Sequence, residues 1–189
     1  AEFILSECQT SIKSILSEEG RVMILRSLLN QIKERLRIFH ASTKLPGLAQ
    51  ELSRVIREFQ QSRVSPQKIL DLSSSDKLPA RARHKLHDIG ILFQEYQSWI
   101  QLKKLHDPDH LLDLAADALR SSRELNTNIP VFQLGGLWMD GFASLTPQEL
   151  NLLTLLAPLS NKTVLAFCAD SFPEDKKEIF SIWLPVHQT

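Results

Sequence analysis

The sequence has 189 residues, 43% of them hydrophobic and 23% charged, which is typical of one soluble globular domain or a domain and a half. The 22 basic residues balance the 22 acidic ones, which excludes a global positive field that would draw the chain to nucleic acid or to anionic lipid. The two cysteines lie far apart and no apolar run reaches the roughly 20 residues of a membrane span, so we expect a cytoplasmic protein without a membrane partner.

Most of the chain shows the apolar spacing of amphipathic helices. Apolar residues recur at steps of three and four, and Ser65 and Asp107 each precede a proline, which is a typical helix start. These patterns predict helices, in chain order, over residues 4–16, 21–40, 46–61, 65–72, 80–104 and 107–119. We place Trp99, on the fifth of these helices, in the hydrophobic core of the protein.

The pattern changes beyond Pro130. Two short apolar runs, at 131–140 and 162–169, predict two buried strands, with Trp138 in the core. Between them, Thr146 and Glu149 form a capping box that begins a helix. The expected fold class is therefore mainly α: a six-helix body followed by a short βαβ unit. Two parallel strands make a poor sheet alone, so we expect an excised fragment.

Four separated stretches carry a resemblance to a known family. In order they read "LSEEGRVMILRSLL", "LAQELSRVIREFQQSRVSPQKIL", "LHDIGILFQEYQSWI" and "MDGFASLTPQELNLL". Together they resemble the AddB subunit of bacterial AddAB-type helicase-nucleases. The resemblance implies a helical subdomain (1–126) inserted into a superfamily 1 helicase-like core, of which 127–189 is a partial α/β segment. It also implies a role in double-strand break repair and recombination beside an AddA-like helicase-nuclease subunit.

In that family comparison, Asp140 and Gly141 lie where a Walker B region is expected. A working Walker B strand holds Mg²⁺ with one acid and normally follows it with a second, but here Gly141 follows Asp140. The sequence also contains no G-x-x-x-x-G-K-[ST] motif to cradle phosphates. We therefore interpret Asp140 and Gly141 as a degenerate Walker B region, and expect no catalytic residue and no cofactor.

Metal-dependent chemistry is an alternative with little support. Asp140, Glu174 and Lys176 supply the residue types of a metal-dependent nuclease, but the last two follow Pro173 and suit a charged helix start. His106 and His110 flank Asp107 and Asp109, but Asp107 is explained as a helix cap and Asp109 suits the helix dipole. We expect no metal site.

Basic residues indicate where DNA would bind. On a continuous helix over 21–40, Arg26, Lys33 and Arg37 fall on one flank, and a second cluster begins the long helix with residues Arg81, Arg83 and Lys85. Such clusters on a neutral chain can follow a DNA backbone through phosphate contacts. The alternatives are a solvated helix face, or a protein-interaction module that binds the partner subunit without touching DNA.

Overall fold

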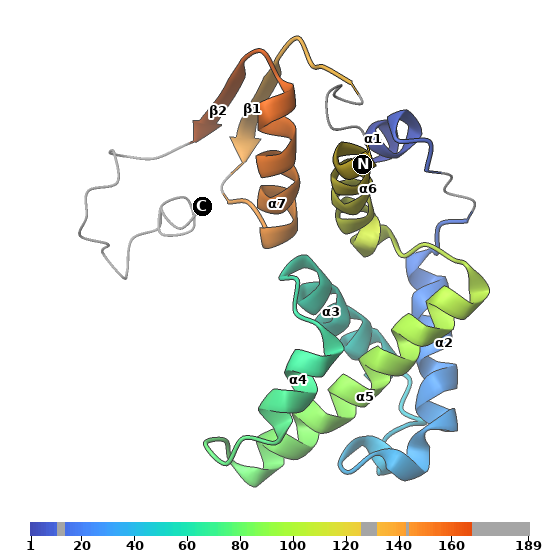
Figure 1. Ribbon diagram of the computed structural model, residues 1–189. Coiled ribbons are helices and arrows are strands. Elements are labelled where there is room, and N and C mark those ends of the chain that lie inside the picture. The colour runs from blue at the N-terminus through green and yellow to red at the C-terminus, as the bar shows by residue number, and fades with distance from the viewer. Residues whose placement is uncertain (11–13, 126–131, 143, 168–189) are drawn as a thin grey trace. The chain divides into compact units, whose positions relative to one another are not determined.

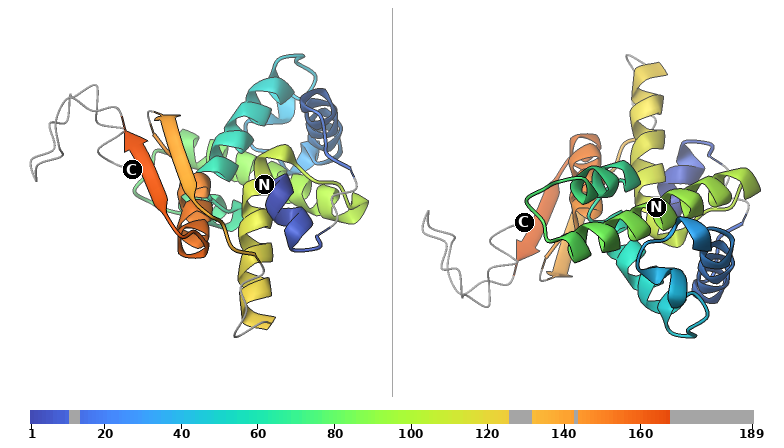
Figure 2. Two further views of the ribbon diagram at one scale, coloured as in Figure 1. Left: turned by 90° about the horizontal axis from the view of Figure 1, so that it is seen from above. Right: turned by 90° about the horizontal axis from the view of Figure 1, so that it is seen from below.

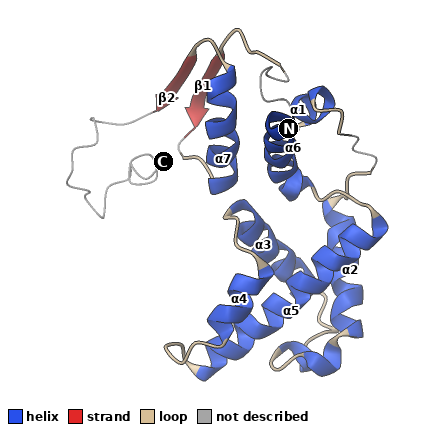
Figure 3. Ribbon diagram, viewed as in Figure 1, coloured by secondary structure: helices blue, strands red, loops and turns tan. Residues whose placement is uncertain are grey.

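The computed structural model describes residues 1–10, 14–125, 132–142 and 144–167 (Figure 1). Helices dominate these residues and the named strands among them are β1 and β2 (Figure 3), so the mainly α fold is confirmed. The chain divides into two compact units. Unit 1 combines Ala1–Ser11 with Leu111–Thr189, and unit 2 spans Ile12–His110.

The described residues of unit 2 form four α-helices. They are α2 (Glu18–Gln31), α3 (Leu48–Gln61), α4 (Pro66–Ser73) and α5 (Ala80–Lys103). The Ser65 hydroxyl accepts a hydrogen bond from the Lys68 amide, and Pro66 occupies the first turn of α4, as predicted. Helix α4 packs along α5, where Leu70 comes so close to Gly90 that a β-carbon there would lie 2.8 Å from it.

The predicted helix over 21–40 is wrong in its second half. Helix α2 ends at Gln31, and residues 32–47 form an irregular segment, which we call the crossing loop. It contains two single-turn 3₁₀ helices, η1 (Lys33–Arg35) and η2 (Phe39–Ala41). The apolar spacing continues through Leu36 and Phe39 because both still pack on the core, although the backbone is no longer α-helical.

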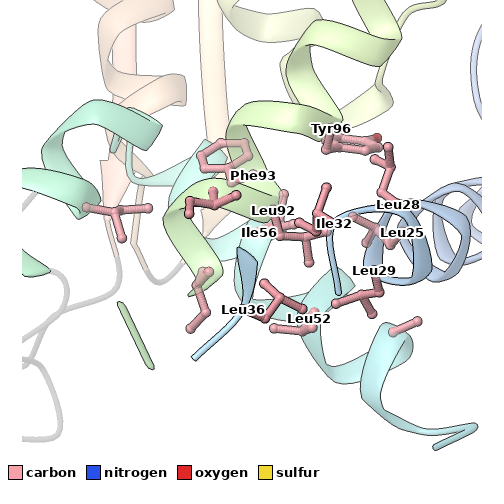
Figure 4. Packing of buried hydrophobic residues seen from close by; sticks show 14 of the residues in the cluster. Leu25, Leu28, Leu29, Ile32, Leu36, Leu52, Ile56, Leu92, Phe93 and Tyr96 are labelled. Atoms are coloured by element: carbon pink, nitrogen blue, oxygen red, sulfur yellow. The ribbon is translucent and has the colours of Figure 1, made fainter. Parts of the chain in front are cut away.

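The core of unit 2 is built mainly from α2, α3 and α5 (Figure 4). Leu25 and Leu29 of α2 meet Ile56 of α3 and Leu92 of α5, and all four side chains are fully buried. Burial of one such side chain stabilises the fold by about 1.5–3 kcal/mol. Trp99 packs half-buried against this cluster, in agreement with its predicted place.

A buried ionic cluster lies beside this core and consists of Arg21, Gln60, Tyr96, Asp107 and Asp109. Arg21 Nη2 donates to Asp107 Oδ1 at 2.6 Å and also to Asp109 Oδ2. Asp107 Oδ2 accepts from the Tyr96 hydroxyl at 2.6 Å and from Gln60 Nε2 at 3.0 Å. Burial, followed by the nearby Asp107 charge, raises the pKa of Tyr96, which therefore remains a hydrogen-bond donor.

The two connections into and out of unit 2 pair with each other. The Leu16 amide donates to the His106 carbonyl at 2.9 Å, and the His106 amide donates to the Ser14 carbonyl at 2.9 Å. Ile15 and His106 thus form a parallel bridge. Since Asp107 follows directly, the buried ionic cluster fixes the outgoing connection to α2, α3 and α5.

Unit 1 contains the remaining helices and the sheet: α1 (Glu2–Glu7), α6 (Leu111–Leu125), β1 (Leu137–Phe142), α7 (Pro147–Leu156) and β2 (Thr163–Phe167). Helix α6 packs against both α1 and α7. The single-turn helices η3 (Pro108–His110) in unit 2 and η4 (Ala157–Leu159) precede α6 and β2. The predicted capping box is confirmed, because Thr146 Oγ1 accepts from the Glu149 amide and the Glu149 carboxylate accepts from the Thr146 amide.

Strands β1 and β2 lie side by side and pair in parallel (Figure 2). Trp138 lies opposite Val164, and Met139 lies opposite Leu165. The pairing and the βαβ order agree with the sequence, but the expectation of buried strands is wrong. Trp138 is 65% exposed, and every residue of β2 is exposed. The indole of Trp138 lies over Gly136, where a β-carbon would meet the ring at 2.0 Å.

The compact units divide the chain elsewhere than at the predicted domain boundary. Helices α1 and α6 belong to unit 1 although they lie within the predicted helical subdomain, 1–126. The boundary between 126 and 127 falls in a stretch outside the described residues. The division into a subdomain over 1–126 and a core segment over 127–189 stays a prediction.

Candidate nucleic-acid interface

The crossing loop is held against α5 by one buried carboxylate. Asp88 Oδ1 accepts from the Arg37 amide at 2.8 Å, and Oδ2 accepts from the amides of Ile38 at 2.7 Å and Phe39 at 3.0 Å. The side chain of Asp88 is fully buried. Three successive amides pointing at one carboxylate form an anion-binding nest of backbone donors.

The electrostatics of Asp88 follow from these donors. Burial alone would raise the pKa of its carboxyl, but the amides of Arg37, Phe39 and Ile38 favour the ionised form and lower the pKa below its ordinary value. The imidazole of His87, with Nδ1 3.2 Å from Oδ1, adds to the lowering. Asp88 is thus a charged group whose hydrogen-bonding capacity is used inside the protein.

This contact places the backbone of Arg37 against α5, the helix that carries the second predicted cluster. Arg37 lies on the loop at the point where Asp88 binds it, and its side chain is exposed. Lys85 and Arg81 precede Asp88 by three and seven positions, which places them on the Asp88 side of α5, and both are exposed. We call Arg37, Arg81 and Lys85 the crossing cluster. At 1.5 Å per residue, Arg81 lies about 10 Å along the helix axis from Asp88.

The other three predicted DNA contacts lie apart from this cluster. Arg26 is exposed on α2, and Lys33 is half-buried in η1, so the prediction that they share one helix flank with Arg37 is wrong. The cause is the end of α2 at Gln31. Arg83 donates to Asp76 at 2.8 Å and points about 200° around α5 from Arg81.

Asp88 is the residue that the sequence analysis missed. A signal was present, since an ionisable residue stood among Leu86, Ile89 and Leu92 on the apolar face of a predicted helix. Burying a charge is costly unless it is paired or hydrogen-bonded, so an acid at such a position indicates a specific set of donors. The donors themselves lie about 50 positions away in the chain.

Asp140 and Gly141 lie at an irregularity of the sheet. The register shifts between Met139 and Phe142, and Gly141 has φ +78°, a left-handed conformation that favours glycine. Asp140 is exposed, and its Oδ1 accepts from the Gly141 amide at 2.6 Å. An acid at position 141 would be strained, because residues with a β-carbon rarely adopt this φ. The glycine and the register shift together are typical of a β-bulge. The Walker B interpretation of the two residues stays a prediction.

The structure gives the other metal candidates different roles. Within the described ranges, no group of three or more His, Cys, Asp or Glu side chains could hold a metal ion. Asp107 and Asp109 bind Arg21 instead, and Asp107 Oδ1 also accepts from the Asp109 amide, as the capping prediction requires. Glu174 and Lys176 lie outside the described residues.

None of the described helices combines the length and apolar content needed to cross a bilayer.

Comparisons with known proteins agree with one another. A family model described as "ADDB, N-terminal" matches residues 1–189. A protein of Desulforamulus reducens, named as a subunit of an ATP-dependent helicase/deoxyribonuclease, is 28% identical over 183 residues, which are 94% of this chain and 15% of that protein.

Two further relatives carry the same name. The protein from Pelotomaculum thermopropionicum is 29% identical over 191 residues, covering 98% of this chain and 16% of its own length. The protein from Heliobacterium modesticaldum is 30% identical over 171 residues, covering 88% of this chain and 13% of its own length. The chain therefore spans 13–16% of the length of these three curated relatives.

Proposed function

The chain belongs to the AddB N-terminal family, and from this premise we propose that it is a non-catalytic DNA-binding scaffold of a helicase-nuclease subunit. Its process would be double-strand break repair and recombination, together with an AddA-like partner subunit. The relatives are named as subunits of an ATP-dependent helicase/deoxyribonuclease, a name that describes proteins acting on DNA.

The crossing cluster is the observation that carries the proposal. Arg37, Arg81 and Lys85 are exposed cations on two segments that Asp88 joins, in a chain with no net charge. Lysine and arginine side chains bind phosphates whatever the base sequence, which suits a protein that follows a DNA backbone. We assign these three residues as phosphate contacts, and no residue as a base reader.

The proposed role requires no chemistry from this region. The sequence lacks a phosphate-cradling P-loop motif, and Asp140 has no second acid at the following position. ATP hydrolysis and DNA cleavage are accordingly assigned to the rest of the complex. We propose no cofactor and no metal for these residues.

Fluorescence anisotropy with a labelled duplex that carries a single-stranded overhang tests DNA contact, at low and moderate salt and without nucleotide. The site variant combines Arg37→Glu, Arg81→Glu and Lys85→Glu. The matched control combines Arg54→Glu, Lys68→Glu and Lys103→Glu, three exposed cations elsewhere on unit 2, so both variants change the net charge equally. Each lost phosphate contact lowers the slope of log affinity against log salt by about 0.9 for duplex DNA.

We expect the site variant to lose most binding, with a slope lower by about two to three, and the control to retain more. Equal losses in both variants would mean that only overall charge matters and would remove the assignment of the crossing cluster. Wild-type protein that binds no DNA at low salt would favour the second candidate, a module that binds the partner subunit. That candidate is favoured by the exposed indole of Trp138 beside Val164.

A further inference from the structure

The crossing loop is held by buried side chains, by short-range backbone hydrogen bonds and by Asp88. Leu36 and Thr43 are buried and Phe39 packs on the core, whereas Arg37 and Lys44 are exposed. Between Leu36 and Phe39, the backbone is fixed by Asp88, whose carboxylate takes up three consecutive amides. A second contact, an ion pair from Arg35 to Glu95 at 2.5 Å, joins an exposed side chain to a half-buried one and contributes little by comparison.

The position of Asp88 on α5 is as informative as its hydrogen bonds. Arg81 and Lys85 lie on the same side of the helix, two turns and one turn before it respectively, whereas Glu95 lies two turns after it. The loop thus runs along α5 from Glu95 to Asp88, and the exposed Lys85 and Arg81 follow in the same direction along the helix.

We propose that Asp88 is a positioning residue for DNA binding: it holds the crossing loop so that Arg37 lies beside Arg81 and Lys85 and the three bind one phosphate backbone together. This inference rests on the proposed function and adds to it a buried acid that touches no DNA. It also explains why an acid occurs beside a cationic surface, since its carboxylate accepts hydrogen bonds from backbone amides within the protein.

Positioning and simple electrostatics predict opposite changes in DNA affinity for one substitution. Asp88→Asn removes a negative charge, so electrostatics alone would strengthen DNA binding. An asparagine, however, can accept on one side only, and its NH₂ group would face amide donors on the other. If Asp88 positions the loop, the variant binds DNA more weakly although its net charge is more positive.

The matched control is Glu95→Gln, which removes one acid from the same side of α5 and breaks only the exposed pair with Arg35. It is expected to bind DNA as well as wild type or better. Asp88→Glu keeps the charge and both acceptor oxygens, and is expected to fall between wild type and Asp88→Asn. It also serves if Asp88→Asn does not fold, which circular dichroism would reveal.

A double-substitution cycle tests whether Asp88 acts through Arg37. We expect Asp88→Asn to lower the salt slope by about one, the equivalent of one phosphate contact. Adding Arg37→Ala to Asp88→Asn should then weaken binding no further than Arg37→Ala alone. Hydrogen exchange at the amides of residues 37–39 should be faster in Asp88→Asn with and without DNA.

The outcomes separate the two claims. If the triple charge reversal abolishes binding but Asp88→Asn binds as tightly as wild type, the positioning role is overturned and the proposed function stands. If neither variant changes DNA binding, both are overturned, even where the amides of 37–39 exchange faster. Additive losses in the cycle would also overturn the inference, because Asp88 would then act independently of Arg37.

Discussion

Units 1 and 2 bury their large side chains to different extents. In unit 2, helices from distant parts of the sequence cover one another, and even its charged Arg21 and Asp88 are buried with partners. In unit 1, the two-stranded sheet leaves Trp138 65% exposed and Phe167 39% exposed. A two-stranded sheet is marginal by itself, so the stability of unit 2 is expected to depend on side-chain packing far more than that of β1 and β2.

Breaking the buried ionic cluster should sharpen this contrast most. Arg21→Ala leaves Asp107 and Asp109 without their buried cation, and the loss of one partner of a buried pair costs about 3–5 kcal/mol. Urea unfolding should show a lower free energy of unfolding, and peptide-resolved hydrogen exchange should place the loss in α2, α3 and α5.

The control for this prediction is Arg54→Ala, which removes an exposed arginine paired with Glu51 and should cost about 0–1 kcal/mol. If both variants unfolded at the same urea concentration, the buried ionic cluster would not stabilise unit 2. Loss of exchange protection confined to α7 would likewise contradict the assignment.

A matched pair of leucines compares the two units directly. Leu92 in α5 is fully buried, and Leu92→Ala should cost about 2–5 kcal/mol through lost burial and a residual cavity. Leu165 in β2 is 39% exposed, so Leu165→Ala removes less buried surface and leaves no closed cavity. We expect its cost to be about 1 kcal/mol or less, measured by urea unfolding. Similar costs would show that β2 is as tightly packed as α5.

Acid should loosen one part of unit 2 by a smaller amount. The pKa of Asp88 is lower in the folded chain than its ordinary value of 3.8, so its stabilisation is complete above that value. It is lost as the pH falls through the lower folded-state pKa. Losing the carboxylate's hydrogen bonds costs about 1–3 kcal/mol. As the pH is lowered, amide exchange at residues 37–39 of the wild-type protein should approach the rate in Asp88→Asn. If the two proteins still differed as much at the lowest pH as at neutral pH, the prediction would be wrong.

Local capping signals in the sequence identified the starts of α4 and α7. Ser65 caps the amide of Lys68, and Thr146 caps the amide of Glu149, so each cap and its partner lie three residues apart. The end of α2 could not be read in this way. The amides of 37–39 are satisfied by Asp88, some 50 residues away, and the apolar spacing of Leu36 and Phe39 mimics a continuing helix.

The candidate site shows the same limit. The sequence indicates Arg37 and Arg81 as members of two separate clusters, but not that one carboxylate joins them. It placed Trp138 in the core because its neighbours are apolar, although a strand exposes alternate side chains and a two-stranded sheet covers few of them. Asp107 carried its capping signal, whereas its ion pair to Arg21, 86 positions away, carried none.

The parallel bridge between Ile15 and His106 brings the entry and exit points of unit 2 next to each other, which matters for protein engineering. A chain that enters at Ser14 leaves at His106, with backbone atoms of the two residues 2.9 Å apart. A host protein that receives such a segment in a surface turn does not have to stretch its own backbone, which is the geometry that tolerates domain insertion. We therefore expect unit 2 to tolerate transfer into a surface turn of another protein as one segment.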